Sequence, residues 1–318
     1  MTTTSASARF VLGTMNFGGR VKEAEARAIA ERCLGHMLPG EMLELDTANM
    51  YAQGESEGIV GRIVAASPRA FGVATKVGLG RRNGKSEGLS RGAVHDGLRG
   101  SLERLRLPAV DVLYLHAPDR QTPVRETAEA LKELHDEGLF FAWGFSNFSS
   151  WRALELRAET RAVALVDPCR SQVIDNLLAR GIEVEHQEFA ASYGLETVAY
   201  NPLAGGLLAG TVRRGETPTE GRFHKNAFYT SRYMHSATFD SIEALAGIAA
   251  RHEMTLMELA YRHLVHHRGH AAVLLGPSKA GHVDAAFSAA KDPLPADVLR
   301  ALDAFRSDTL PAQIPYAR

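Results

Sequence analysis

The segments AFGVATK, residues 70–76, and VDVLYLH, residues 110–116, decide the fold predicted for this chain. Each is an apolar run that ends in a polar residue, and four further runs end in the same way. The six residues that follow these runs are Asp46, Lys76, His116, Ser146, Gln172 and Tyr200, at steps of 30, 40, 30, 26 and 28 positions. A strand, a helix and two short loops require about 30 residues, so the spacing predicts a repeating strand–helix unit.

Strand and helix patterns alternate along the chain, which predicts a parallel sheet. The expected strands are residues 9–13, 41–46, 70–76, 110–116, 140–146, 164–169, 195–201 and 271–276. Helices are expected at 22–37, 56–66, 90–106, 123–138, 149–160, 181–194 and 279–291, with Ser56 and Ser90 as N-caps. Eight such units predict a (β/α)8 TIM barrel, in which the polar strand ends share the C-terminal, active-site face.

The interval between the seventh and eighth expected strands is long, with 76 residues from Tyr200 to Gly276. It begins with a Gly-, Pro- and Arg-rich loop, residues 202–236, followed by helical stretches at 237–252 and 256–267. A long loop inside a compact domain is usually functional, so we expect it to arch over the active-site face together with the C-terminal tail. No linker divides residues 1–318, and a single domain is expected.

Composition excludes several classes of function. The formal net charge is −1, from 36 basic and 37 acidic residues, so neither nucleic acid nor a membrane surface is an expected partner. The two cysteines form no CxxC and the N-terminus has no signal-peptide pattern, which indicates the cytoplasm. His263, His266 and His267 lie on one expected helix without a carboxylate; we interpret them as mostly surface residues, and a metal site is the alternative.

Several segments now identify the chain's relatives. They are LDTANMYAQGESEGIVG (45–61), VATK (73–76), DVLYLHAPD (111–119), GFSNFS (144–149), YNPLAGGLLAG (200–210) and LLGPS (274–278). Together they resemble the aldo-keto reductase superfamily over nearly the whole chain. HAPDRQTPVRETAEAL (116–131), GRF (221–223) and the terminal YAR resemble its aflatoxin aldehyde and succinic semialdehyde reductase branch. SQVIDNLLARGIEVE (171–185) resembles a neighbouring branch that includes general-purpose bacterial reductases and potassium-channel β subunits.

The resemblance implies a catalytic tetrad of Asp46, Tyr51, Lys76 and His116. Tyr51 would donate a proton to the substrate carbonyl, and because a free phenol has a pKa of about 10, a nearby cation is needed to lower it. Lys76 would be that cation, held by Asp46, while His116 would orient the carbonyl. The alternative interpretation is a loop ion pair between Asp46 and Lys76 with His116 as a strand-end cap.

The resemblance also implies NADPH as the cofactor, with NADH as an alternative. Ser146, Asn147 and Gln172 would bind the nicotinamide carboxamide and Tyr200 would stack on the ring. The residues implied for the pyrophosphate and the adenosine phosphate are Asn201, Leu203, Gly205, Gly206, Leu208, Arg222, Gly276, Ser278, Lys279 and His282. The glycines would allow close approach of the backbone, and Gly276 to Ser278 would open a helix whose free N–H groups suit a phosphate. Ala285 and Ala286 depart from the Glu-Asn pair that is common in the family.

The expected substrate is a small carbonyl compound, and the protein is expected to be a monomer or a homodimer. Met15, Trp143, Arg232 and Arg318 are candidate substrate contacts, with a terminal arginine able to bind a carboxylate. Phe17, Met50 and Phe148 are further candidate apolar walls, or plain core. Two other functions remain open: a biosynthetic oxidoreductase acting on a sugar or secondary metabolite, and a non-catalytic, cofactor-sensing subunit.

Overall fold

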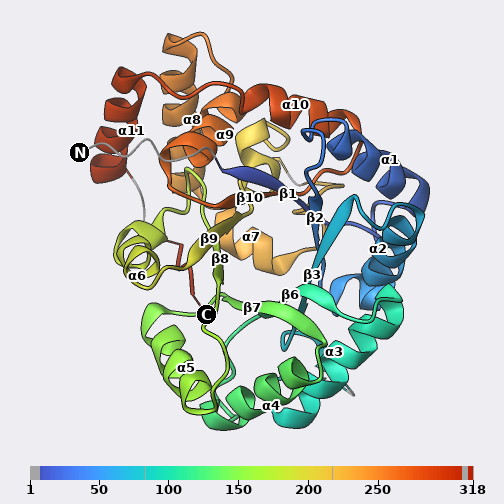
Figure 1. Cartoon of the computed structure of the whole chain (residues 1–318). Helices are drawn as coiled ribbons and strands as arrows, with labels where there is room; N and C mark the ends of the chain where they lie inside the picture. Colours follow the sequence, from blue (N-terminus) through green and yellow to red (C-terminus); the bar gives the residue numbers. More distant parts are fainter. Residues whose placement is uncertain (1–7, 83, 217, 310–313, 318) are drawn as a thin grey trace.

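A computed structural model of the 318-residue chain describes residues 8–309, other than 83 and 217, and residues 314–317. In this part of the chain eight parallel strands close into a barrel, in the order β1-β10-β9-β8-β7-β6-β3-β2. Helices surround the barrel (Figure 1). The predicted (β/α)8 TIM barrel is therefore confirmed.

The barrel strands are short and follow the expected positions closely, with one exception. They are β1 (Arg9–Gly13), β2 (Leu43–Asp46), β3 (Phe71–Val77), β6 (Val110–Leu115), β7 (Phe140–Ser146), β8 (Arg170–Ile174), β9 (Glu196–Tyr200) and β10 (Ala272–Leu275). The exception is the sixth strand of the barrel, predicted at 164–169 but formed by β8. Pro168 cannot donate a ladder hydrogen bond, and the barrel instead uses the more polar segment that follows it.

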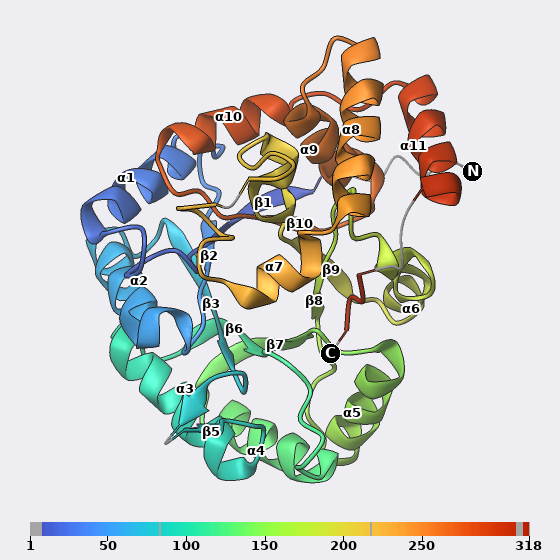
Figure 2. The ribbon, with the colours of Figure 1, turned by 180° about the vertical axis from the view of Figure 1, so that it is seen from behind.

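The outer layer contains α1 (Glu23–Leu34), α2 (Glu55–Ala66), α3 (Arg91–Leu105), α4 (Val124–Asp136), α5 (Ser150–Ala162), α6 (His186–Ser192), α9 (Leu256–His267) and α10 (Gly281–Ala289). Two more helices, α8 (Ser236–Arg251) and α11 (Ala296–Thr309), pack against each other beside α9 (Figure 2). Ser90 caps α3 as predicted, because its side chain accepts a hydrogen bond from the Ala93 N–H. Ser56 does not cap α2: it is buried inside the helix and bonds to Thr14 and Thr47.

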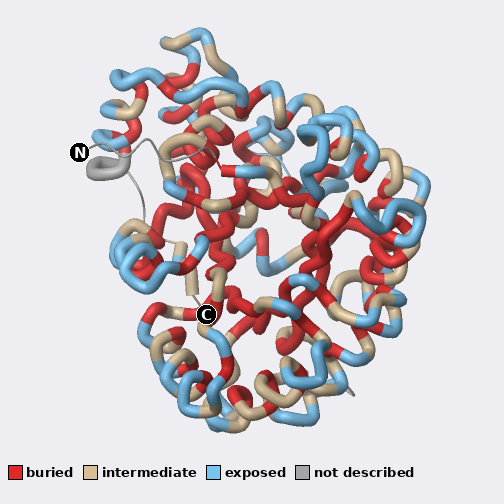
Figure 3. Tube along the Cα trace, viewed as in Figure 1, coloured by how far each residue is buried: buried red, intermediate tan, exposed pale blue. Residues whose placement is uncertain are grey.

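Side chains alternate across each barrel strand, so each strand has an inner and an outer face. Leu45, Val73, Leu113, Trp143 and Phe145 point outward and join the main core between the strands and the helices. The inner face packs smaller clusters, such as Ala74, Val112 and Tyr114. The barrel is consequently buried on both faces over most of its length, and most strand residues are buried in Figure 3.

The segment between β9 and β10 covers one end of the barrel. It contains a 3₁₀ stretch, η3 (Ala204–Ala209), and the short helix α7 (Ala227–Tyr233), which lies across the barrel opening in Figure 2. The Tyr233 hydroxyl accepts hydrogen bonds from Asn176 Nδ2 and Asn201 Nδ2, and both asparagines lie just after barrel strands, so α7 covers the C-terminal face as predicted. In the described residues, no helix has both the length and the apolar character needed to cross a membrane.

A buried polar cluster lies between β8 and the helix layer. Asp175 accepts hydrogen bonds from Arg268 at 2.9 Å and from His270 at 2.7 Å. His186 lies nearby with Nε2 3.2 Å from the Ser171 hydroxyl, and burial lowers its pKa to about 4. His263 is also buried, so its prediction as a surface residue is wrong; the periodicity of α9 turns it inward.

Gly61→Ala should lower the stability of the protein. An added Cβ at Gly61 of α2 would lie 2.3 Å from the Leu105 carbonyl oxygen of α3, a backbone atom that cannot move aside cheaply. We expect a loss of about 1–3 kcal/mol in the free energy of unfolding, measured by urea denaturation. Gly58→Ala in the same helix is the control: its Cβ meets only the end of the Arg62 side chain, so unchanged or higher stability is expected. Equal losses would contradict the close helix contact.

His186→Gln should flatten the pH dependence of stability. The pKa of the native imidazole, about 4, is below the ordinary 6.5, so the unfolded chain takes up a proton first as pH falls. The wild type therefore loses about 2 kcal/mol through this group between pH 7 and pH 5, and the variant should lack that loss. Urea unfolding at the two pH values measures the difference. If the free energy of unfolding fell equally between pH 7 and pH 5 in both proteins, a buried neutral His186 would be ruled out.

Candidate active site

The polar strand ends meet at the C-terminal end of the barrel. The register pairs Asp46 with Ala74, Lys76 with Tyr114, and Ser146 with Gln172. Inward-facing positions repeat every second residue, which aims all of these side chains at the barrel axis. The six residues that the spacing singled out are Asp46, Lys76, His116, Ser146, Gln172 and Tyr200, and all except the half-buried Tyr200 are buried.

Lys76 and Asp46 form a fully buried ion pair. The Lys76 ammonium donates to Asp46 Oδ1 and, at 2.7 Å, to the Thr47 carbonyl oxygen. The second carboxylate oxygen of Asp46 accepts from Gln172 Nε2 at 2.8 Å. Burial lowers the pKa of Lys76, but the charges of Asp46 and Tyr51 outweigh it, and the net pKa is raised above its ordinary value. Lys76 is therefore charged at neutral pH.

Tyr51 reaches the pair from the loop after β2. Its ring centroid lies 5.2 Å from Lys76 Nζ and 5.8 Å from the His116 ring, which it meets edge-on. Burial raises the pKa of Tyr51 and the Lys76 ammonium lowers it, with a net pKa above the ordinary value. Lys76 thus acts in the predicted direction, but burial has the larger effect, which the sequence pattern alone does not show.

His116 and Tyr200 are held by one amide. Asn147 Nδ2 donates to the His116 carbonyl oxygen at 2.8 Å, and Asn147 Oδ1 accepts from the Tyr200 hydroxyl at 2.7 Å. Asn147 adopts a left-handed backbone conformation, with φ of 65°, which asparagine tolerates better than most residues. The Tyr200 ring is therefore fixed in orientation at the mouth, as a stacking surface requires. Ser146 Oγ accepts a third bond from Asn147 Nδ2, at 3.0 Å.

The segment after β9 is held by a hydrogen bond to helix α7, which covers the barrel mouth. Asn201 Oδ1 accepts from the Gly205 N–H at 2.8 Å, and Asn201 Nδ2 donates to the Tyr233 hydroxyl. Gly205 and Gly206 have φ of 73° and 108°, and an added Cβ would meet Tyr229 and Phe223, or Thr211. The glycines are therefore required by local packing. Leu208 is buried and Leu203 is half-buried, so these two residues offer backbone groups more than side chains to a ligand.

Two guanidinium groups converge on a neutral oxygen at the mouth. Arg20 and Arg222 donate to Asn16 Oδ1, at 2.8 and 3.1 Å. Burial and the neighbouring Arg222 lower the pKa of Arg20 below its ordinary value. Two cations that share one amide oxygen fit an anion placed between them, such as a pyrophosphate. Arg222 was predicted for this role, whereas Arg20 was missed; its position after the FGG turn of the first loop was the available signal.

The segment before α10, which was predicted to bind a phosphate, differs from the prediction. Helix α10 begins at Gly281, close to the expected start at 279, so Gly276, Pro277 and Ser278 lie before its first turn rather than opening it. Ser278, Lys279 and His282 are exposed, with Ser278 Oγ 3.4 Å from His282 Nδ1. The Ala280 N–H is not free: it donates to Glu25 Oε1 of α1 at 2.7 Å. A carboxylate therefore occupies part of the helix end that was expected to receive a phosphate.

The candidate substrate contacts separate into three groups. Met15 is exposed at the mouth beside Arg222, and Arg232 is half-buried on α7 with its guanidinium over the Phe228 ring, 4.3 Å from the centroid. Trp143 is wrongly predicted: it faces outward from β7, is fully buried and donates to the Val166 carbonyl oxygen. Arg318 lies outside the described residues.

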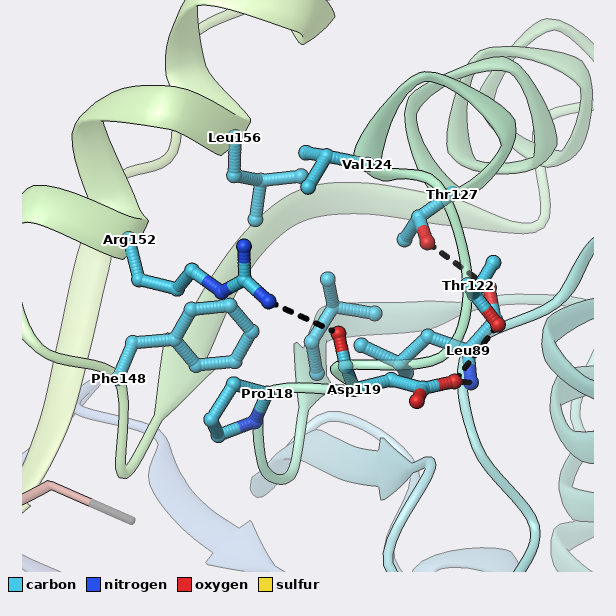
Figure 4. Close-up of a pocket in the computed structure, with 10 residues that line it drawn as sticks. Leu89, Pro118, Asp119, Thr122, Val124, Thr127, Phe148, Arg152 and Leu156 are labelled. Atoms are coloured by element: carbon cyan, nitrogen blue, oxygen red, sulfur yellow. Dashed lines mark hydrogen bonds between the residues drawn. The ribbon is translucent and has the colours of Figure 1, made fainter.

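A small pocket lies beside the end of β6 and the residues that follow it (Figure 4). Leu115, Pro118, Phe148 and Leu156 line it, together with Arg152, whose Nη2 donates to the Asp119 carbonyl oxygen at 3.5 Å. None of the tetrad lines this pocket. The pocket is therefore separate from the mouth at which the polar strand ends meet.

Comparison with known proteins agrees with this geometry. The profile of the Aldo/keto reductase family matches residues 9–307. The chain belongs to this family. It is 36% identical to aflatoxin B1 aldehyde reductase member 2 of Rattus norvegicus over 83% of this chain and 75% of that protein. It is 31% identical to a probable voltage-gated potassium channel subunit beta of Oryza sativa subsp. japonica, over 85% and 83% of the two chains.

Among solved structures, a glycerol dehydrogenase from Gluconobacter oxydans is similar, with a TM-score of 0.78 and 25% identity over 97% of this chain and 94% of that chain. Family membership makes the protein an NAD(P)H-dependent oxidoreductase that interconverts carbonyl and alcohol groups. The resemblance drawn from the sequence motifs is thereby confirmed.

Proposed function

We propose that this aldo/keto reductase uses NADPH to reduce aldehydes and ketones to alcohols, with Tyr51 as the proton donor. The observation that carries the proposal is the convergence of Tyr51, Lys76 and His116 on one point at the barrel mouth, with Asp46 buried behind them. The aldehyde reductase relatives support a carbonyl substrate.

Each residue of the tetrad has a separate task in this mechanism. The Tyr51 hydroxyl hydrogen-bonds the carbonyl oxygen and transfers its proton as negative charge develops there. Lys76 stabilises the phenolate that remains, because a cation favours the charged form of its neighbour. Asp46 holds Lys76 in place and keeps it charged. His116, edge-on to Tyr51, orients the carbonyl.

The cofactor would lie across the mouth, where it supplies the hydride. Tyr200 would pack on the nicotinamide, while Ser146, Asn147 and Gln172 would contact the carboxamide. Arg20 and Arg222 would bind the pyrophosphate from two sides, which matches their shared approach to Asn16. Ser278, Lys279 and His282 would contact the adenosine 2′-phosphate, which favours NADPH over NADH.

The free thiols of Cys33 and Cys169 agree with residence in the cytoplasm.

A cofactor-sensing subunit is the second candidate, because a relative carries the name of a potassium channel subunit. Sensing requires bound cofactor but no proton donor. The complete tetrad, with Tyr51 beside Lys76, favours turnover over sensing alone.

Tyr51→Phe should lower kcat for carbonyl reduction by about 10²- to 10⁴-fold, because the ring remains and the donated proton is lost. NADPH affinity, measured by fluorescence titration, should change little. Tyr114→Phe is the control: this hydroxyl also lies inside the barrel, and Lys76 Nζ is 5.9 Å from its ring centroid, but it faces the floor rather than the mouth. An unchanged kcat for Tyr51→Phe would refute the assigned donor.

Glu25→Gln should increase selectivity for NADPH. The amide can still accept from the Ala280 N–H, while the negative charge beside Ser278 and Lys279 is removed. We expect the ratio of the NADH to the NADPH dissociation constant to rise about 3- to 10-fold at low ionic strength. The matched control is Glu23→Gln on the same helix as Glu25, because the Glu23 carboxylate binds Arg27 of α1 and Arg62 of α2. Equal changes in the two dissociation constants would show that the charge of Glu25 does not act on the 2′-phosphate.

A further inference from the structure

The loop that carries Tyr51 has an irregular backbone. Within the 3₁₀ turn η1 (Tyr51–Gly54), Ala52 and Gln53 have φ of 47° and 58°, and Gly54 has φ of 93°. Non-glycine residues in this region cost of order 1–3 kcal/mol each and persist only where neighbouring contacts impose them. The position of the Tyr51 ring therefore depends on contacts from outside the turn.

Glu87 supplies such a contact from the loop between β3 and α3. Its Oε1 accepts from Asn49 Nδ2 at 2.6 Å, two residues before Tyr51. Its Oε2 accepts from the N–H groups of Gly78 and Gly80, at 3.0 and 2.9 Å. One carboxylate thus joins the Tyr51 loop to the residues that follow Lys76 on β3.

The glycines make room for this carboxylate. A Cβ at Gly80 would lie 2.8 Å from Glu87 Oε2, and Gly78 has φ of 101°, a conformation that L side chains rarely adopt. Gly97 of α3 is nearly as close, with an ideal Cβ 3.0 Å from Glu87 Oε1. The backbone around Glu87 is therefore fitted to its side chain.

Lys76 does not depend on Glu87. Asp46 and the Thr47 carbonyl oxygen hold its ammonium, and β3 is paired on both sides. The Glu87–Asn49 contact therefore affects the position of Tyr51, while the position of Lys76 is fixed by other groups. Asn49 adds a second link, because its N–H donates to the Lys76 carbonyl oxygen at 3.1 Å.

We propose that Glu87 is a positioning residue, which sets the distance between the Tyr51 hydroxyl and the Lys76 ammonium by holding Asn49. This inference rests on the proposed role of Tyr51 as proton donor. Misplacement of a reacting group by about 1 Å can lower a rate about 100-fold, so loss of the contact affects kcat more than binding.

The chain offers a conservative variant that should rescue the contact. In Glu87→Gln the amide oxygen still accepts from Gly78 and Gly80. Its NH₂ then faces Asn49, whose Oδ1 is buried and has no hydrogen-bond partner within the described residues. Rotation of the Asn49 amide by half a turn restores the hydrogen bond, whereas Glu87→Ala removes it.

The test compares Glu87→Ala, Glu87→Gln and Asp111→Ala with the wild type. Asp111 is the matched control, since its carboxylate accepts from the Val73 N–H at 2.7 Å, at the opposite end of the same strand. We measure kcat and KM for 4-nitrobenzaldehyde, the NADPH dissociation constant, and hydrogen exchange of residues 47–54.

Glu87→Ala should lower kcat about 10- to 100-fold, leave KM and the NADPH dissociation constant within about threefold, and speed exchange of residues 47–54. Glu87→Gln should keep at least about a third of kcat, and Asp111→Ala should change neither kcat nor this exchange. Normal kcat in Glu87→Ala, or an equal loss in Glu87→Gln, overturns the inference. A wild type that binds NADPH but reduces no carbonyl contradicts the proposed function instead, and exchange in Glu87→Ala still decides whether Glu87 holds the loop.

Discussion

The charge of Lys76 is the constraint on which this site depends. A fully buried ammonium costs several kcal/mol in lost hydration and is tolerated only with close partners. Asp46, the Thr47 carbonyl oxygen and, through Asp46, Gln172 provide them. These groups come from β2, β3 and β8, so the ion pair exists only when distant parts of the chain close the barrel in register. Tyr51 and His116 then meet a cation whose position is already fixed.

The two ends of the barrel interior use charge differently. At the N-terminal end, Arg170 binds Glu44 and Glu196, and Arg9 also binds Glu44, so two cations and two anions satisfy one another. At the mouth, Arg20 and Arg222 donate to the Asn16 amide oxygen, and Arg222 also contacts the Met15 sulfur and the Tyr229 ring. The charges at the N-terminal end of the barrel are therefore paired with one another. At the mouth, the charges of Arg20 and Arg222 can interact with an anionic cofactor. This difference agrees with the rule that barrel activity resides at the C-terminal end.

The spacing of the strand ends predicted the barrel, and the resemblance of the motifs to the aldo-keto reductases pointed to Asp46, Tyr51, Lys76 and His116, which the fold brings close together. It failed where the outcome depends on contacts between distant residues. The sixth strand of the barrel was misplaced because Ser171, Gln172 and Asp175 read as polar. Ser171 and Asp175 are buried in the polar cluster under α6 and α9, and Gln172 is buried against Asp46 inside the barrel. Trp143 was assigned to the mouth, yet the alternation from Ser146 through Gly144 to Ala142 shows that it faces outward, a signal that was available. The contacts of Glu25 with Ala280 and of Asn49 with Glu87 span 255 and 38 positions, and no local pattern reports them.

The most direct test of this account is a fluorescence titration of the purified protein with NADPH, continued by adding 4-nitrobenzaldehyde and following oxidation of the nucleotide. The account predicts saturable NADPH binding followed by turnover. Absence of binding by either NADPH or NADH would contradict it, because the cationic mouth would then not be a nucleotide site.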